Sequence, residues 1–139
     1  GEYMSNFMLE IVTSELLIFE RQVKMVIARG VEGDIGILKG HEPFVTPLQI
    51  GTIKIKIDGQ FKLAAISQGY MQVTKDKVVI LVDTAEWPEE IDVNRAEKAR
   101  ERAEKRLQQK TADLDILRAE IALKKATTRL GVAKMTGRH

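Results

Sequence analysis

The residues best suited to chemistry are cations that recur along the last third of the chain. Two stripes share one spacing, i, i+7 and i+11: Arg95, Arg102 and Arg106 in the first, Arg118, Lys125 and Arg129 in the second. At 100° per residue on an α-helix, each stripe is about 40° wide. Two such stripes repel each other if a hairpin brings them together, unless an anion lies between them. A triphosphate held by guanidinium groups fits this pattern, and we expect binding without hydrolysis because the chain has no Walker lysine.

Spacing alone also allows a plainer interpretation, in which the arginines form a solvated helix face. Acidic neighbours are available to that face at Glu97, Glu101 and Glu104. The pair Glu101 and Lys105, four residues apart, would contribute roughly 0.2–0.5 kcal/mol. Against this interpretation, Lys98–Arg102 and Arg102–Arg106 place like charges one helical turn apart. The spacing leaves both interpretations open.

Residue types that enzymes use for covalent or acid–base catalysis are scarce. The chain has no cysteine, and His41 and His139 are isolated from each other. Glu89 and Glu90 are neighbours in a turn, where they act on the following helix through their charge. Gly33-x-x-Gly36 lacks the Gly-Lys-Ser/Thr that completes a phosphate loop. We therefore expect no catalytic and no metal-binding residues.

The segment from Trp87 to Ala96 divides the chain. The residue before a proline is pushed out of the helical region, so Trp87-Pro88 ends whatever precedes it. Asp92 can accept a backbone N–H bond as a helix N-cap. Arg95 lies one turn on, close enough to pair with Asp92. The pattern predicts strands before this segment and helices after it.

Short runs rich in β-branched residues predict the strands. They lie at 8–13, 23–28, 52–57, 61–66, 70–74 and 77–82. Asp58-Gly59 is a strong hairpin signal, and a second hairpin turns at Lys75-Asp76. Residues 30–48 hold four glycines and two prolines, which indicate turns. Six or more antiparallel strands with no helix between them predict a β-sandwich or a flattened barrel.

Two helices follow, joined by a polar interruption at residues 108–111. The second begins at Asp113 or Asp115 and runs to about Leu130. Alanines line both helices, so the hairpin buries little area and is only marginally stable alone. The fold class we predict is α+β, an N-terminal antiparallel β-sandwich followed by a C-terminal antiparallel two-helix hairpin. We assign residues 4–87 to the sandwich and 88–139 to the hairpin, and residues 1–3 to an expression remnant.

Composition and charge narrow the class of partner. Residues 1–88 carry 9 Lys+Arg and 11 Asp+Glu, a net charge of −2, whereas residues 89–139 carry 13 and 9, a net charge of +4. The small excess and the 5% aromatic content do not favour nucleic acid. No apolar run reaches the length of about 18 residues that spans a bilayer. The lack of cysteine suits a reducing compartment.

Two motifs resemble the epsilon subunit of bacterial rotary F-type ATP synthases. Gly33-Asp34-Ile35-Gly36-Ile37-Leu38-x-Gly40-His41-x-Pro43 is similar to that family's loop signature, and Ile91-Asp92-x-x-Arg95-Ala96 to its ATP-binding motif. The match extends over essentially the whole chain from Met4. It implies a sandwich attached to the gamma subunit of the shaft and resting on the c-ring, and a hairpin that inhibits ATP hydrolysis. Folded back, the hairpin would bind ATP; extended, it would reach the alpha and beta subunits of the catalytic head.

The resemblance also implies site residues. The ATP-binding set would be Glu86, Ile91, Asp92, Arg95, Ala96, Arg102, Lys125 and Arg129. Arginine is expected where this chain has Lys125, which keeps the charge but loses the bidentate fork. Glu32 and His41 fall in the region that resembles the contact with the ring and shaft. ATP would be a regulatory ligand, with or without Mg²⁺, on a peripheral protein at the cytoplasmic face of the cell membrane that does not insert into the bilayer.

Two other classes remain open at this point. A free-standing ATP-sensing module would close its hairpin on ATP without a gamma subunit. A chaperone-like β-body with helical arms would bind unfolded chains promiscuously, but the arms are short and lack exposed large apolar residues.

Overall fold

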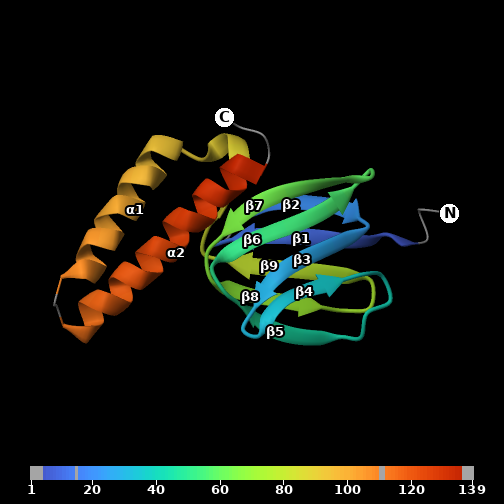
Figure 1. The fold of residues 1–139 in the computed structure, drawn as a ribbon. Helices are drawn as coiled ribbons and strands as arrows, with labels where there is room; N and C mark the ends of the chain where they lie inside the picture. Colours follow the sequence, from blue (N-terminus) through green and yellow to red (C-terminus); the bar gives the residue numbers. More distant parts are fainter. Residues whose placement is uncertain (1–4, 15, 110–111, 136–139) are drawn as a thin grey trace.

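The computed structural model describes residues 5–14, 16–109 and 112–135. Within these ranges strands come first and helices last, as the sequence predicts (Figure 1). The strands are β1 (Phe7–Thr13), β2 (Leu16–Val23), β3 (Met25–Gly30), β4 (Gly33–Ile37), β5 (Phe44–Leu48), β6 (Gly51–Ile57), β7 (Gln60–Ile66), β8 (Gly69–Val73), β9 (Lys77–Val82) and β10 (Ala85–Glu86). A 3₁₀ turn, η2 (Pro88–Glu90), leads into α1 (Val93–Gln108) and α2 (Asp113–Met135).

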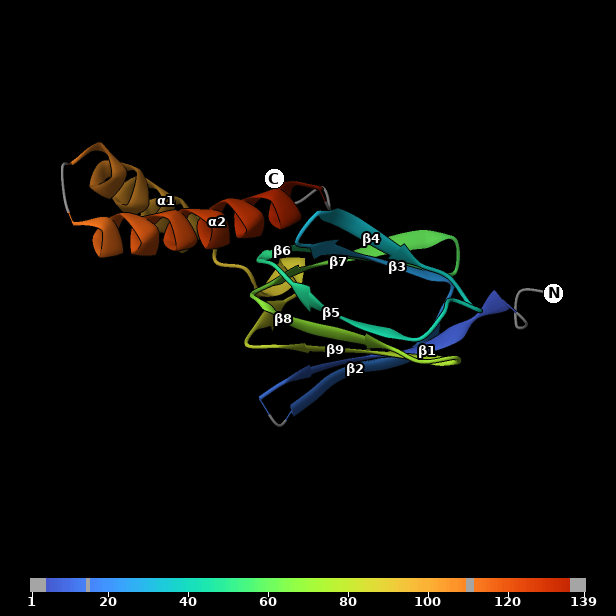
Figure 2. The ribbon, with the colours of Figure 1, turned by 90° about the horizontal axis from the view of Figure 1, so that it is seen from below.

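The strands form two five-stranded sheets that pack face to face. One has the order β2-β1-β9-β8-β5 and the other β10-β7-β6-β3-β4. Figure 2 shows the two layers, with the second sheet on the side of the helices. Pairing is antiparallel except between β1 and β9, which run in parallel. The predicted β-sandwich is confirmed, with this one parallel pair as an addition.

The main core lies between the sheets and follows from strand alternation. In β1, Leu9 and Ile11 are fully buried, and in β6 the same is true of Ile53 and Ile55. The residues between them point outward, because successive side chains of a strand point to opposite faces. The hairpin predicted at Asp58-Gly59 is present, with both residues at positive φ.

Two parts of the strand prediction were wrong in detail. The run 23–28 contains the end of β2 and the start of β3, because the chain bends at Lys24. Residues 30–48, interpreted as turns, also contain β4 and β5. Glycines and prolines there conceal strand pairing; Gly36, for example, pairs with Ile27 inside β3–β4.

Strand β7 loses the alternation that the other strands show. Its last four residues, Leu63 to Ile66, are all buried. Ala64 and Ile66 face the main core, whereas Leu63 and Ala65 join a second cluster with Ile91, Val132 and Ala133. The outer face of this sheet is therefore the surface on which the hairpin docks.

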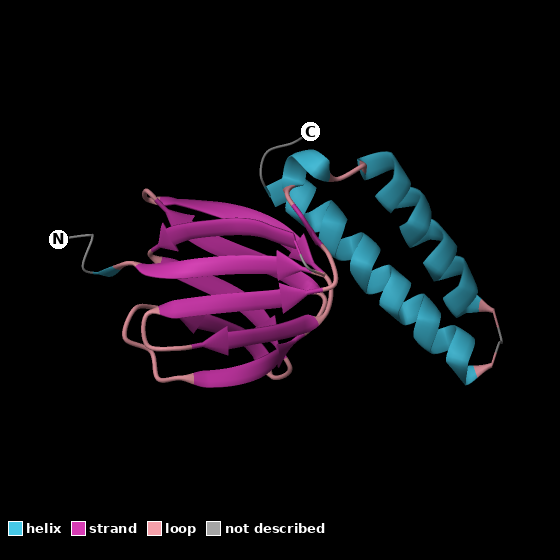
Figure 3. Ribbon diagram, turned by 180° about the vertical axis from the view of Figure 1, so that it is seen from behind, coloured by secondary structure: helices cyan, strands magenta, loops and turns pink. Residues whose placement is uncertain are grey.

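The two helices pack against each other through small residues. Ala96 and Ala103 of α1 and Ala119 and Ala126 of α2 are buried. The second helix runs five residues beyond the predicted Leu130, to Met135. Seen from behind, the helix ends that lead into the connection between α1 and α2 lie farthest from the sandwich (Figure 3). Among the described residues that follow the sandwich, Ile91, Val132 and Ala133 are those that contribute to the second cluster.

Candidate functional site

The junction between the domains is fixed by local hydrogen bonds. The Trp87 N–H donates to Glu90 Oε1 at 2.9 Å, and the Trp87 ring lies 5.6 Å from Phe19 and beneath Lys62 Nζ at 4.4 Å. Asp92 is the N-cap of α1, as predicted, with Oδ1 accepting from the Arg95 backbone N–H at 3.0 Å. Asp92 and Arg95 thus contact each other through the backbone, and the structure shows no ion pair between their side chains.

Beneath α2, an ion pair joins residues 43 positions apart in sequence. Arg129 Nε donates to Glu86 Oε1 at 2.5 Å, and each side chain is about one-third exposed. The pair lines a pocket of about 10 Å³ together with Lys125 and the hydroxyl-bearing Ser67, Thr84 and Thr128. A cavity of roughly 10–15 Å³ holds one water molecule, so with the hairpin docked this pocket has no room for a larger ligand, and we call it the closed pocket.

The eight residues of the expected ATP set fall into separate environments. Glu86, Lys125 and Arg129 line the closed pocket. Ile91 is buried in the second cluster, and Ala96 in the seam between the helices. Arg95 and Arg102 are exposed on α1, and neither lines that pocket. The structure therefore brings three of the charged residues together and leaves the α1 arginines outside.

The hydroxyl groups of this pocket had no signal in the sequence. Thr84 donates its backbone N–H to Ser67 Oγ at 2.8 Å, across 17 residues. Only the pairing of β10 with β7 brings these residues together. A register prediction for the last strand would have been needed to find them.

The acidic residues that pair with an arginine on α1 contact Arg100, which belongs to neither cationic stripe. Arg100 donates to Glu97 and, at 2.6 Å, to Glu104. The hydrogen bond to Glu97, opposed by desolvation and assisted by nearby carboxylates, raises the pKa of Arg100 above its ordinary value. The guanidinium groups of Arg95, Arg102 and Arg106 have no ion-pair partner among the described residues. The cationic stripe of α1 is thus left unneutralised by its own helix.

Glu32 and His41 lie at opposite ends of β4. Glu32 is in the exposed turn between β3 and β4, and Arg29 and Asp34 on either side of that turn line a cleft with residues of α2. His41 is beyond the other end, with its ring 5.2 Å from the Phe44 ring and Nδ1 3.2 Å from the Glu42 carbonyl. Five residues of strand separate them by about 16 Å. The two residues therefore do not share one patch.

An apolar row that the sequence did not single out crosses the outer face of the other sheet. Its members are in register across five strands: Leu17, Val12, Leu81, Tyr70 and Pro47. Leu17, Leu81 and Tyr70 are 51%, 44% and 57% exposed. A shallow depression of about 580 Å³ includes four of the five. Contiguous exposed apolar surface of this kind marks a protein interaction site.

Fold and site together define a class of protein: a β-sandwich that carries a two-helix hairpin on its outer face as a separately docked unit. Residues 6–88 match the family described as ATP synthase, Delta/Epsilon chain, beta-sandwich domain. Residues 89–134 match the ATP synthase, Delta/Epsilon chain, long alpha-helix domain. Within the part of the chain that the structure describes, no helix is both long and apolar enough to span a membrane.

Known proteins similar to this chain agree with these matches. The ATP synthase epsilon chain of Alkaliphilus metalliredigens is 53% identical over 94% of this chain and 97% of its own length. That of Brevibacillus brevis is 52% identical over 94% of this chain and all of its own. A chain of the Euglena gracilis mitochondrial ATP synthase, solved as OSCP/F1/c-ring, is 28% identical with a TM-score of 0.82, over 93% of this chain and 81% of that one. The chain belongs to the family of F-type ATP synthase epsilon subunits.

Proposed function

We propose that this chain is the non-catalytic central-stalk subunit that couples ring rotation to the catalytic head of a proton-translocating ATP synthase. Its hairpin inhibits ATP hydrolysis when it extends along the shaft toward the alpha and beta subunits. The observation that carries this proposal is the hairpin's attachment through a second cluster of its own, separate from the sandwich core.

The size of the second cluster determines how readily the hairpin undocks from the sandwich. Leu63, Ile91 and Val132 are its large members, and the rest are alanines. At about 1.5–3 kcal/mol for each large apolar side chain, burial contributes roughly 5–9 kcal/mol before any opposing cost. This is an upper bound, since the undocked chain also buries some of that surface. Binding to another subunit supplies free energy of the same order, so a partner can displace the hairpin.

We propose that the docked hairpin binds ATP through Glu86, Ile91, Asp92, Arg95, Ala96, Arg102, Lys125 and Arg129, with or without Mg²⁺. Support comes from the unneutralised cations of α1 and from Lys125 and Arg129 lining one pocket. That pocket is too small for a nucleotide, so Arg129 must release Glu86 and α2 must shift as ATP enters. ATP is then a ligand of the docked state and favours it by mass action.

We assign the gamma subunit to the apolar row defined by Val12, Pro47, Leu17, Tyr70 and Leu81. This face lies on the opposite sheet from the hairpin, so gamma and the docked hairpin do not compete for it. Because Glu32 and His41 lie at opposite ends of the sandwich, we assign them to different partners among the ring and the shaft. The assembled protein is then peripheral at the cytoplasmic face of the cell membrane.

Truncation tests the inhibitory role. A chain ending at Glu90 keeps every strand and the apolar row, so it should co-purify with gamma as the full chain does. We expect the reconstituted complex to hydrolyse ATP faster with the truncated chain than with the full one. Equal rates at equal occupancy would refute inhibition by the hairpin. Failure to co-purify with gamma would instead favour a free-standing ATP-sensing module.

Two substitutions at one position test ATP binding. Asp92→Ala removes both the helix cap and the proposed ligand contact, whereas Asp92→Ser keeps a capping hydroxyl but shortens the side chain. If Asp92 contacts ATP, calorimetric titration should show weaker binding in both variants, with helix content preserved in Asp92→Ser by circular dichroism. Wild-type affinity in Asp92→Ser would show that Asp92 serves only as the cap.

A further inference from the structure

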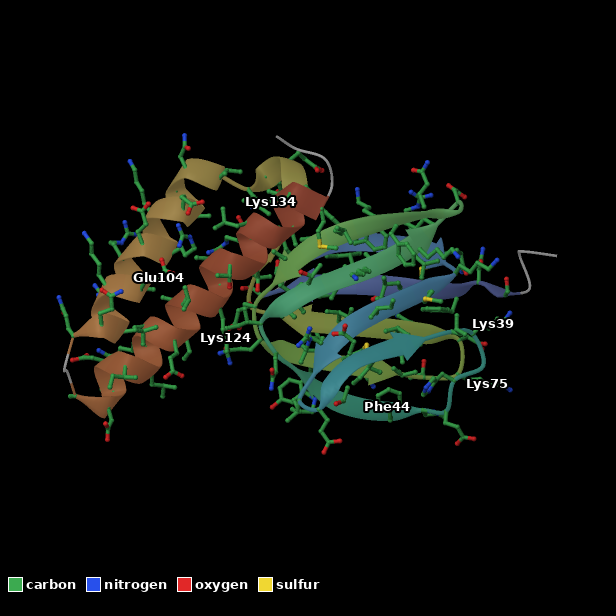
Figure 4. The ribbon with its side chains drawn as sticks, in the orientation of Figure 1. Lys39, Phe44, Lys75, Glu104, Lys124 and Lys134 are labelled. Atoms are coloured by element: carbon green, nitrogen blue, oxygen red, sulfur yellow. The ribbon has the colours of Figure 1, made fainter. Side chains whose placement is uncertain are left out.

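A polar cleft separates α2 from the outer face of β3, β4 and β6. Its volume is about 390 Å³, within the range of about 300–1,000 Å³ that small-ligand sites occupy. It is distinct from the closed pocket of Glu86 and Arg129, since of the residues lining the two only Thr128 is shared. Figure 4 shows Lys124 on α2 beside the end of the sandwich. Nothing in the proposed function uses this cleft.

The charges around the cleft are unbalanced. Three cations line it, Arg29, Lys54 and Lys124, against one carboxylate, Asp34. Arg29 Nε donates to Asp34 Oδ1 at 2.8 Å, which accounts for that carboxylate. Lys54 and Lys124 have no ion-pair partner among the described residues. The cleft therefore carries two positive charges in excess.

These two lysines come to the cleft from different elements. Lys54 is half-buried on β6, in register with Leu63, which lies under α2, whereas Lys124 is exposed on α2. Like charges at one cleft repel each other, and an anion between them would relieve that repulsion.

The remaining lining offers neutral hydrogen-bond donors. Thr52 and Thr128 line the cleft, and among the described residues their hydroxyl groups make no hydrogen bond. Gly51 also lies there, and a Cβ at that position would sit 3.0 Å from Arg29 Cβ. The absence of a side chain at Gly51 thus leaves room for the stem of Arg29.

We propose that this cleft binds a phosphate group, held by Lys54 and Lys124 with donors from Arg29, Thr52 and Thr128. Lysine ammonium groups bind phosphate as point charges, and hydroxyl groups complete the coordination. Lys124 comes from α2 and Lys54 from β6, so the site is complete only when the hairpin is docked. The bound anion therefore stabilises the docked hairpin, whether or not ATP binds at the closed pocket.

Pyrophosphate is the probe, added to the full-length ¹⁵N-labelled chain at constant ionic strength. We expect saturable shifts of the backbone amides around Lys54 and Lys124 at up to about 10 mM, the range of weak single-site binding. The double variant Lys54→Gln/Lys124→Gln should bind at least about tenfold more weakly, because both point charges are gone. ATP is titrated in parallel, and the same amides shifting with ATP would identify nucleotide phosphate as a second source.

Two matched controls separate this cleft from its neighbours. Lys56→Gln removes a charge from the same face of β6 two residues away, and Lys125→Gln removes one from the closed pocket. Both should keep pyrophosphate binding at Lys54 and Lys124. Equal weakening in Lys56→Gln would show general charge attraction and overturn the proposal, as would unsaturable shifts in the wild type. Asp92 does not line this cleft, so Asp92→Ser should keep pyrophosphate binding. Wild-type ATP affinity in that variant would count against Asp92 as a nucleotide ligand and leave the anion site untouched.

A separate measurement tests whether the bound anion stabilises the docked hairpin. The chain has no cysteine, so Ala65→Cys provides a single thiol that lies beneath α2. At 100 times its dissociation constant, pyrophosphate should slow labelling of that thiol by about 100-fold. Slowing that persists in the Lys54→Gln/Lys124→Gln variant would overturn the link between this anion and docking.

Discussion

Shortening Val132 to alanine should release the hairpin without weakening the sandwich. Val132 is fully buried in the second cluster, among Leu63, Ala65, Ile91 and Ala133. Losing two carbons costs about 1.6 kcal/mol at about 0.8 kcal/mol per CH₂ group. Depending on how far the neighbouring side chains relax into the residual cavity, the total is about 1.5–2.5 kcal/mol. Because about 1.4 kcal/mol is a tenfold change in an equilibrium, undocking becomes about 10- to 70-fold more favourable.

Labelling of the thiol in the Ala65→Cys background measures that change. Position 65 is 5% exposed and reacts when α2 leaves the strand, so the labelling rate follows the undocked population. We expect Val132→Ala to accelerate labelling by the same 10- to 70-fold. The matched control is Val78→Ala, which removes the same two carbons from the main core, where Val78 is 1% exposed.

The Val78→Ala control distinguishes independent undocking of the hairpin from global unfolding. If the hairpin undocks by itself, Val78→Ala should lower the unfolding temperature but leave labelling at position 65 nearly unchanged. If both substitutions accelerate labelling equally, the thiol is reached only by global unfolding. The hairpin and the sandwich would then be one cooperative unit, and a hairpin that moves independently would be refuted.

Three further substitutions test individual contacts. Glu86→Gln should make undocking of the hairpin more favourable by about 1 kcal/mol, a small value because the ion pair with Arg129 is about one-third exposed. The control Glu89→Gln should leave thiol labelling unchanged, and equal labelling in the two variants would contradict this. Gly69→Ala should destabilise the sandwich by about 3 kcal/mol in chemical denaturation, because its Cβ would lie 1.9 Å from the Leu81 carbonyl oxygen, whereas Gly36→Ala, with 4.0 Å to Ile27, should cost far less. Arg100→Gln should lower the melting temperature equally at about pH 6 and pH 9, because the raised pKa of Arg100 keeps its contribution to stability complete at every pH below the pKa of the unfolded state. A difference between the two pH values would count against a stabilising ion pair of Arg100 with Glu97 and Glu104.

The sequence predicted those features that depend on local order. Alternation in residues 52–57 predicted β6, and Asp58-Gly59 predicted the turn after it. Asp92 was predicted as the cap of α1 because an N-cap needs only its own side chain and a backbone N–H three residues on. These signals extend over a few residues, so propensity and spacing suffice to find them.

Features that depend on sheet register were beyond the sequence patterns. Helical spacing placed Arg129 in a cationic stripe but gave no sign that Glu86, 43 residues earlier, neutralises it. The same spacing gave no sign that Lys54 and Lys124 face one cleft, since one belongs to a strand and the other to a helix.

The buried run at the end of β7 shows why the two kinds of information must be combined. Leu63-Ala64-Ala65-Ile66 has no polar residue, so it fits a strand covered on both faces as well as a buried helix segment. The hairpin resolves the ambiguity, because it covers Leu63 and Ala65 on the outward face of β7 and leaves the outward positions of β6 only partly covered. Half-coverage of β6 is what leaves Lys54 partly buried beside a cleft. The small apolar contact area that lets the hairpin undock therefore also leaves the polar cleft in which we place the phosphate group. A substitution that extends the apolar contact over β6 should strengthen docking and abolish anion binding together.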